Sequence, residues 1–207
     1  RMKNSSMYED YSRDMYTPKL VKKPMFMEKD KKLKGAERGT AMHAVMQKID
    51  YSEELTIDDI NRQMEAMVEK EFITKEQADS VEAQKILNFF KSNIGKRLLK
   101  AKSVRRETPF HMELKSTEIY ESLPKEIYEN ENIMIQGIID CYFEEEDGIV
   151  LLDYKSDYFK EGQEESIIKK YKVQIDYYAR AIEELTGKVV KEKYLYLFYV
   201  DKEVEIK

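Results

Sequence analysis

The stretch VLLDYKSDYF, residues 150–159, places charged side chains where a buried strand should continue. Three apolar residues, 150–152, predict such a strand, but Asp153 and Lys155 follow directly. Charged groups are rarely buried unless they are paired or bind a ligand. Because side chains alternate along a strand, Asp153 and Lys155 share one face. The pair therefore predicts either a salt-bridged strand end or a site for a charged ligand.

A second carboxylate, Asp140, lies on the preceding predicted strand, and the EEEDG segment between the two predicts a hairpin turn. A turn centred between Glu146 and Asp147 sets Asp140 opposite Asp153, and a turn centred one residue later sets it opposite Lys155. In both registers the three charged side chains share a face, whereas a half-step register would split them. Opposed carboxylates repel each other, and a divalent cation such as Mg²⁺ or Mn²⁺, which prefer oxygen ligands, would remove the repulsion.

Four other polar residues are candidates for the same site. His43 lies one turn after Gly39 on a predicted helix, where the missing side chain permits close backbone approach. A helical histidine is more often a partly buried polar residue than a ligand. Gln136 places an amide on an apolar strand, and Gln174 and Tyr178 share one helix face. The ordinary interpretation of the last two is a surface amide beside a core aromatic residue.

Hydrophobic periodicity predicts helices before residue 102. The first spans 36–49 and the second Thr56–Phe72. Thr74 with Gln77 forms a capping-box signature that opens a third helix. This third helix is expected to present one continuous apolar face, formed by Ile86, Leu87, Phe90, Ile94 and Leu98.

After residue 102 the composition changes to that of strands. The segments SVRRETPFHMEL, NIMIQGIIDCYFEE and GIVLLDYK are rich in β-branched and aromatic residues. A long helix, Glu164–Leu185, follows and ends at Gly187. KEKYLYLFYV and EVEIK predict two more strands. This order of elements predicts an α/β domain with a sheet core and a helical N-terminal part.

Length and composition limit the class of protein. The 207 residues are 42% hydrophobic and 37% charged, which is enough for one well-packed domain. We find no apolar run near the roughly 20 residues that span a membrane. The start, RMKNSSMYED, has no apolar stretch typical of a secretory signal, and without an initiator Met it suggests a fragment of a longer chain. Residues 1–35 predict a basic arm or linker.

Charge and cysteine content narrow the class further. The net charge of −5 argues weakly against nucleic acid, but residues 91–106 carry seven Lys or Arg and no acid. Residues 121–147 hold nine acidic groups against one lysine. The single cysteine, Cys141, excludes an internal disulfide and fits a reducing cytoplasm. Its ordinary interpretation is a small buried apolar residue.

Four short motifs, in order, resemble those of one known family. GTAMH, IQGIIDCYF, LLDYKSD and the Q-x-x-x-Y of QIDYY resemble the RecB-type nucleases of the PD-(D/E)xK superfamily, across Gly39 to Val200. Each motif alone is weak, and four in sequence are specific. The resemblance implies a restriction-endonuclease-like fold: a mixed central sheet flanked by helices. The nuclease domain would be 36–207, with a helical part, 36–102, and a sheet-containing core, 103–207.

The resemblance also implies roles for single residues. His43, Asp140 and Asp153 would be metal ligands, together with the backbone carbonyl of Tyr154. Lys155 would position the attacking water, so that Asp140, Asp153 and Lys155 form the catalytic set. The implied reaction is hydrolysis of a phosphodiester bond assisted by one or two Mg²⁺ or Mn²⁺ ions.

Further positions follow the family pattern less closely. Gln174 and Tyr178 would support the site and guide the DNA strand. Glu107, in the R-E-x-P-F pattern, is a candidate for a second metal or a supporting position, and Gln136 is another supporting candidate. Ser156 stands where the family often has Thr and keeps the hydroxyl group.

The resemblance implies partners as well. The substrate would be DNA, chiefly a single strand delivered by the helicase portion of the same polypeptide, and the partner would be a second nuclease-bearing protein. The cysteines of the iron–sulfur cluster found in some relatives are missing, so no cluster is expected. The chain has no G-x-x-x-x-G-K-[ST] motif, so ATP would bind outside it.

Two rival interpretations remain open from the residues. One is a catalytically inactive DNA-binding or scaffold module, against which the presence of all four residues of the proposed centre argues. The other is a metal-free binding protein whose strand ends are salt-bridged.

Overall fold

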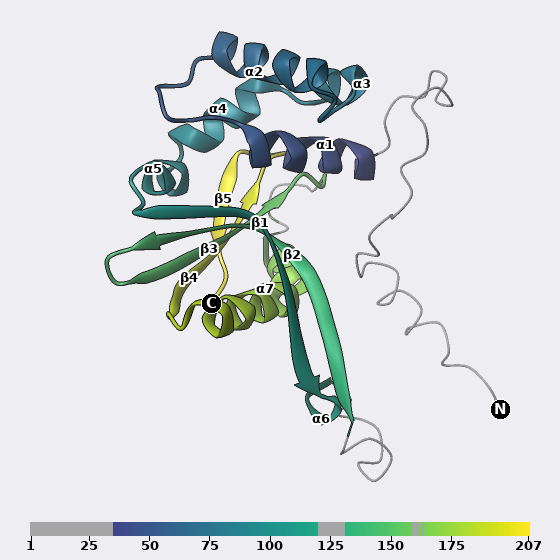
Figure 1. Cartoon of the computed structure of the whole chain (residues 1–207), viewed down its shortest axis with the longest axis vertical. Helices are drawn as coiled ribbons and strands as arrows, with labels where there is room; N and C mark the ends of the chain where they lie inside the picture. The colour runs from purple at the N-terminus through teal and green to yellow at the C-terminus, as the bar shows by residue number, and fades with distance from the viewer. Residues whose placement is uncertain (1–34, 120–130, 159–161, 163) are drawn as a thin grey trace, which may run out of the picture. The chain divides into compact units, whose positions relative to one another are not determined.

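The structure is a computed structural model, and it describes residues 35–119, 131–158, 162 and 164–207 (Figure 1). These residues belong to one compact unit, 33–207. The expected basic arm, 1–35, lies almost wholly outside the described residues.

A five-stranded mixed sheet forms the centre of this unit, with its strands in sequence order. The central pair β3 and β4 is parallel and every other neighbouring pair is antiparallel. The strands, all expected from the sequence, are β1 Ser103–Lys115, β2 Asn132–Glu145, β3 Gly148–Lys155, β4 Val190–Leu197 and β5 Lys202–Glu205. The β1–β2 ribbon extends well beyond the other strands, as Figure 1 shows.

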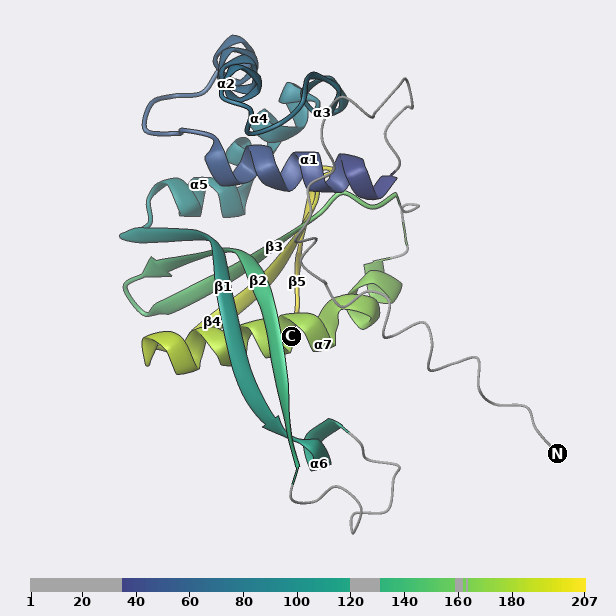
Figure 2. The ribbon, with the colours of Figure 1, turned by 45° about the vertical axis from the view of Figure 1, so that its right-hand side comes forward.

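Helices cover both faces of the sheet (Figures 1 and 2). The five N-terminal helices lie on one face, and α7, which makes the crossover between the parallel strands, lies on the other (Figure 2). The helices are α1 Gly35–Lys48, α2 Ile57–Glu69, α3 Lys75–Ser80, α4 Ala83–Lys91, α5 Asn93–Leu99, α6 Ser116–Ile119 and α7 Glu164–Thr186. None of the helices in the described part of the chain has the length and apolar character needed to cross a membrane.

Two hydrophobic cores follow from this layering. On the face of the N-terminal helices, Val150, Leu152 and Tyr154 of β3 pack against α1, α2 and α4. On the other face, Ile149 and Leu151 pack against α7. The strict alternation along β3 explains its continuous apolar run, because both faces of this central strand are buried.

The expected single third helix was wrong: three helices, α3, α4 and α5, occupy this segment. The predicted capping box at Thr74 and Gln77 is confirmed and opens α3. Val81 is extended (φ −99°, ψ 122°) and ends α3. Ser92, also extended, ends α4 and accepts a hydrogen bond from the backbone N–H of Gly95 as the N-cap of α5. The apolar spacing alone could not reveal these breaks, because the residues on both sides bury the same kind of surface.

Candidate active site

The β2–β3 hairpin has the first of the two predicted registers. Glu145 pairs with Gly148, so the turn is centred between Glu146 and Asp147. The last ladder pair joins Cys141 to Leu152, and one further step sets Asp140 opposite Asp153. Both carboxylates are buried. The Asp140 carboxylate accepts the backbone N–H of Tyr154 at 2.8 Å, and this contact ties the end of β3 to β2.

The alternation of faces reverses on β2 and β1 at one shared position. Cys141 packs with the N-terminal helices, whereas Ile139, two residues away, packs on the α7 side. On β1, Glu107 has a left-handed backbone (φ 48°), and regular pairing with β2 occurs at Arg106 and Thr108 on either side of it. Strict period-two alternation therefore holds along β3 but fails at Asp140, where this irregularity brings Glu107 to the site.

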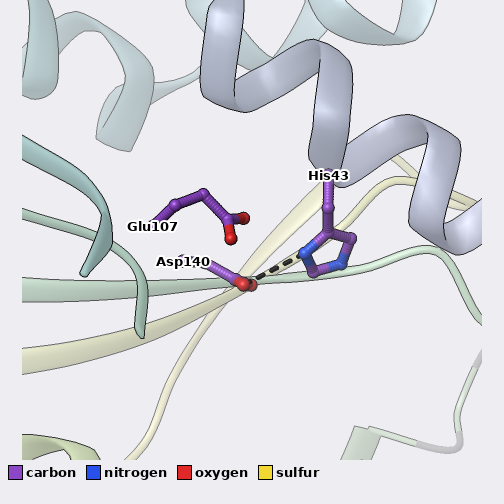
Figure 3. A group of neighbouring side chains, drawn as sticks. All are labelled: His43, Glu107 and Asp140. Atoms are coloured by element: carbon purple, nitrogen blue, oxygen red, sulfur yellow. Dashed lines mark hydrogen bonds and ion pairs between the residues drawn. The ribbon is translucent and has the colours of Figure 1, made fainter. Parts of the chain in front are cut away.

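His43 reaches the same place from α1. Its Nδ1 lies 3.0 Å from Oδ1 of Asp140, 97 residues away in sequence (Figure 3). A Cβ on Gly39 would approach Oγ of Ser156 to 2.9 Å, which confirms that the missing side chain permits the close approach of α1. Burial disfavours the imidazolium, yet the Asp140 carboxylate and, more distantly, Asp153 raise the pKa of His43 from 6.5 to about 9.

Three side chains converge closely enough to hold a cation. A nitrogen of His43 and a carboxylate oxygen each from Glu107 and Asp140 all lie within 4.8 Å of one another, and Figure 3 shows the three directed toward a common point. Burial and the nearby Asp140 raise the pKa of Glu107, whereas His43 outweighs the burial of Asp140 and lowers its pKa. One imidazole with two carboxylates is a donor set that suits Mn²⁺ or Mg²⁺.

Asp153 lies beside this group as the partner of Lys155. The Lys155 ammonium is 2.7 Å from Oδ2 of Asp153, yet that oxygen receives no hydrogen bond of acceptable geometry from the described residues. Burial and the Asp140 charge raise the pKa of Asp153 to about 6, although Lys155 opposes this shift. A buried carboxylate in this state fits a site that receives a further cation.

The α7 face holds Lys155 in place. Gln174 accepts a 3.4 Å hydrogen bond from the Lys155 ammonium and donates to the Tyr178 hydroxyl at 2.7 Å. The Tyr178 ring packs edge-on against Phe110 of β1. The ammonium also lies 4.3 Å from the centroid of the Tyr171 ring. Burial lowers the pKa of Lys155, but Asp153 and Asp140 outweigh this effect and raise it, so the side chain stays cationic.

A family comparison agrees with these motifs. The profile of the PD-(D/E)XK nuclease superfamily matches residues 16–206. The chain belongs to the PD-(D/E)XK nuclease superfamily. Its mixed sheet between two layers of helices has the restriction-endonuclease-like architecture expected from the sequence (Figure 1).

Relatives within the superfamily have a common name. The chain is 96% identical over all 207 residues to an ATP-dependent helicase/nuclease polypeptide of Clostridium novyi (strain NT), of which it covers 17%. It is 51% identical over 199 residues to the protein of the same name from Thermoanaerobacter sp. (strain X514), with 96% of this chain and 16% of that protein covered. The chain thus spans about a sixth of the length of these curated relatives.

With the superfamily established, the predicted site residues divide by position. His43, Asp140, Asp153 and Lys155 come together, as the motifs predicted, and Gln174 with Tyr178 lies directly behind the lysine. The side chain of Tyr154 packs into the core, and its carbonyl as a metal ligand stays a prediction. Gln136 is exposed on the β1–β2 ribbon opposite His111, four residues and so about 13 Å along the strand from Asp140.

Sequence reasoning missed Tyr171, which contacts Lys155 and donates a 2.6 Å hydrogen bond to Asp157. It precedes Gln174 by three residues, so helical spacing alone placed it on the same face. Glu107 was only a minor candidate from the sequence, whereas the structure sets it in the three-residue group with His43 and Asp140.

Proposed function

We propose that the chain is a divalent-metal-dependent deoxyribonuclease that hydrolyses phosphodiester bonds of single-stranded DNA as an exonuclease. One observation carries the proposal: His43, Glu107 and Asp140 converge within 4.8 Å beside the buried Asp153–Lys155 pair. Hydrolysis of phosphodiesters needs both a cation held by carboxylates and a positive group near the attacking water. The superfamily match supports the same reaction class.

The residues of this chain divide the work. His43, Asp140 and Asp153 would hold Mg²⁺ or Mn²⁺ with the Tyr154 carbonyl, and Glu107 is added from its position. When bound, such an ion lowers the pKa of a water and neutralises phosphate charge. Since imidazole is a better ligand for Mn²⁺ than for Mg²⁺, the donor set favours Mn²⁺.

Lys155 supplies a positive charge that does not depend on the metal. Its ammonium is fixed by Asp153 and Gln174, and Tyr178 orients the Gln174 amide. In this position it would orient the attacking water and stabilise charge that develops on the phosphate. Gln174 and Tyr178 thus act through Lys155 as positioning residues.

The basic segment 91–106 contributes a narrower DNA surface than its charge suggests. Arg97 pairs with two carboxylates, and Arg106 donates to the carbonyls of Met46 and Ile49 at the end of α1. The other basic residues of the segment are exposed and available to phosphates: Lys91, Lys96, Lys100, Lys102 and Arg105.

The relatives extend the proposal to a larger machine. By their name they belong to an ATP-dependent helicase/nuclease, so the DNA strand would be delivered by the helicase portion of the same polypeptide. An AddB-type protein would be the partner, and the biological role would be end processing of double-strand breaks for recombination. This substrate would place the reaction in the bacterial cytoplasm.

Cleavage of an end-labelled single strand by the purified chain tests the proposal. We expect cleavage with Mg²⁺ or Mn²⁺, none with EDTA, and none from Asp140→Asn. The matched control, Asp147→Asn, removes a carboxylate from the same hairpin but outside the site and should retain activity. Metal-independent cleavage, or equal activity of Asp140→Asn, would refute the proposal, and DNA binding without any cleavage would favour the inactive module.

A further inference from the structure

Two exposed tyrosine rings meet at the end of the sheet that carries Lys155. Tyr158 follows Lys155 by three residues, and Tyr199 follows Leu197, the β4 residue paired with Lys155, by two. Their ring centroids are 4.7 Å apart with planes at 70°. Tyr158 is 68% exposed and Tyr199 48% exposed, so both present aromatic surface to solvent.

The turn that carries Tyr199 is fixed relative to Lys155. The backbone N–H of Phe198 donates to the Lys155 carbonyl at 2.9 Å. Lys85 of α4 donates to the Tyr199 carbonyl and pairs with Asp201, both at 3.0 Å. These bonds hold the exposed ring in place without a ligand, and a preorganised surface loses little entropy on binding.

We infer that Tyr158 and Tyr199 form a stacking site for a nucleobase adjacent to the scissile phosphate, and that this site selects unpaired strands. The inference rests on the proposed function and specifies its substrate. Three extended residues span at most ~11 Å, so Tyr158 lies within reach of a neighbouring nucleotide. Aromatic rings stack with any base, whereas the bases of a duplex already stack on each other.

The surrounding charges favour a base over a phosphate at this position. The Asp157 carboxylate accepts the Tyr171 hydroxyl, and Asp201 pairs with Lys85, so both acids flank the rings. Carboxylates repel a phosphate but leave the uncharged face of a base unaffected. The nucleotide at the tyrosines should therefore present its base to them and direct its phosphate toward Lys155.

Steady-state cleavage of a dT oligonucleotide with Mg²⁺ tests the inference. Replacing both tyrosines by Ala should raise KM roughly tenfold or more and change kcat less than threefold. An abasic oligonucleotide of equal length should compete poorly with dT for the wild-type chain and equally well with dT for the Ala variant. Replacing both tyrosines by Phe keeps the rings and should restore the wild-type KM.

Phe72→Ala serves as the control, since it removes an exposed ring from the segment between α2 and α3. Equal melting temperatures for all variants would establish that folding is intact. Normal cleavage with an unchanged KM in the double Ala variant would overturn the inference alone, and would indicate that the rings contact another part of the protein. Absence of metal-dependent cleavage by the wild-type chain would overturn the proposed function and the inference with it.

Discussion

Two charged clusters lie at opposite ends of β3, and each combines three carboxylates with two basic side chains. The first contains the proposed catalytic residues, with Glu107 and His43 from neighbouring elements. The second lies around the β2–β3 turn, where Arg97 and Lys191 meet Glu145, Asp147 and Glu192.

The clusters differ in burial and in how completely the charges are bonded. Arg97 donates two hydrogen bonds to Glu145 and two to Glu192, at 2.6–3.0 Å, and its bonds lower the pKa of Glu145 to about 2. In the first cluster, burial raises the pKa of Asp153 to about 6, and one of its oxygens lacks a well-formed hydrogen bond among the described residues.

Equal numbers of charges thus serve different purposes. Half-exposed, fully bonded pairs stabilise the attachment of α5 to the sheet. Buried carboxylates that lack partners destabilise the metal-free chain and are characteristic of sites that bind cations or perform chemistry. Solvation and bonding, and not the count of charges, distinguish the two.

The largest expected effect separates the clusters by activity. Lys155→Ala should lower the cleavage rate about 100- to 1,000-fold, because the ammonium acts on the water and the developing charge. Metal affinity, measured by titration calorimetry, should change little. Arg97→Ala, the matched removal of a cation from the other cluster, should leave the rate within threefold. Equal losses of rate and metal affinity in Lys155→Ala would instead make the lysine an organiser of the metal site.

Stability should respond in the opposite order. Arg97→Ala leaves Glu145 and Glu192 without their main partner and should lower the free energy of unfolding by about 1–3 kcal/mol. Urea unfolding of the metal-free chain measures this value. A smaller loss for Arg97→Ala than for Lys155→Ala would contradict the structural role of the second cluster.

Asp153→Asn should abolish cleavage yet stabilise the metal-free chain at pH 7.5 by of order 1 kcal/mol. The pKa of Asp153 is raised in the folded state even with the attraction of Lys155 included. The ionised carboxylate therefore destabilises the fold fully above pH about 6, and this penalty disappears as pH falls toward the unfolded value of 3.8. The stabilisation should accordingly vanish near pH 4. A melting temperature that falls at pH 7.5 would identify Asp153 as a structural ion-pair partner.

The smallest effect concerns the approach of α1. Gly39→Ala brings a Cβ to 2.9 Å from the Ser156 hydroxyl, so that the serine or the helix must shift. We expect a 3- to 10-fold loss of kcat through displacement of His43. Adding Ser156→Ala removes the clashing oxygen and should restore most of the rate. No rescue in the double variant would show that the loss has another cause.

Local patterns were sufficient for much of this structure. The hairpin register followed from the turn residues between Asp140 and Asp153, because turn geometry fixes which residues are opposite. The Asp–x–Lys spacing put Asp153 and Lys155 on one face of a central strand, and helical spacing put Gln174 beside Tyr178. The capping box at Thr74 was equally local.

Tertiary packing decided the rest. The left-handed backbone of Glu107 and the reversal of faces at Asp140 depend on two separate cores pulling the ribbon to opposite sides, and no period in the sequence encodes this. Only the fold could show that His43 meets Asp140 across 97 residues and that Asp153 pairs with Lys155 instead of joining the three-residue group. The sequence by itself determined which groups could do the chemistry and on which strand they lie. Their distances and burial, and hence their pKa values, came from the long-range packing of α1, β1 and α7 around them.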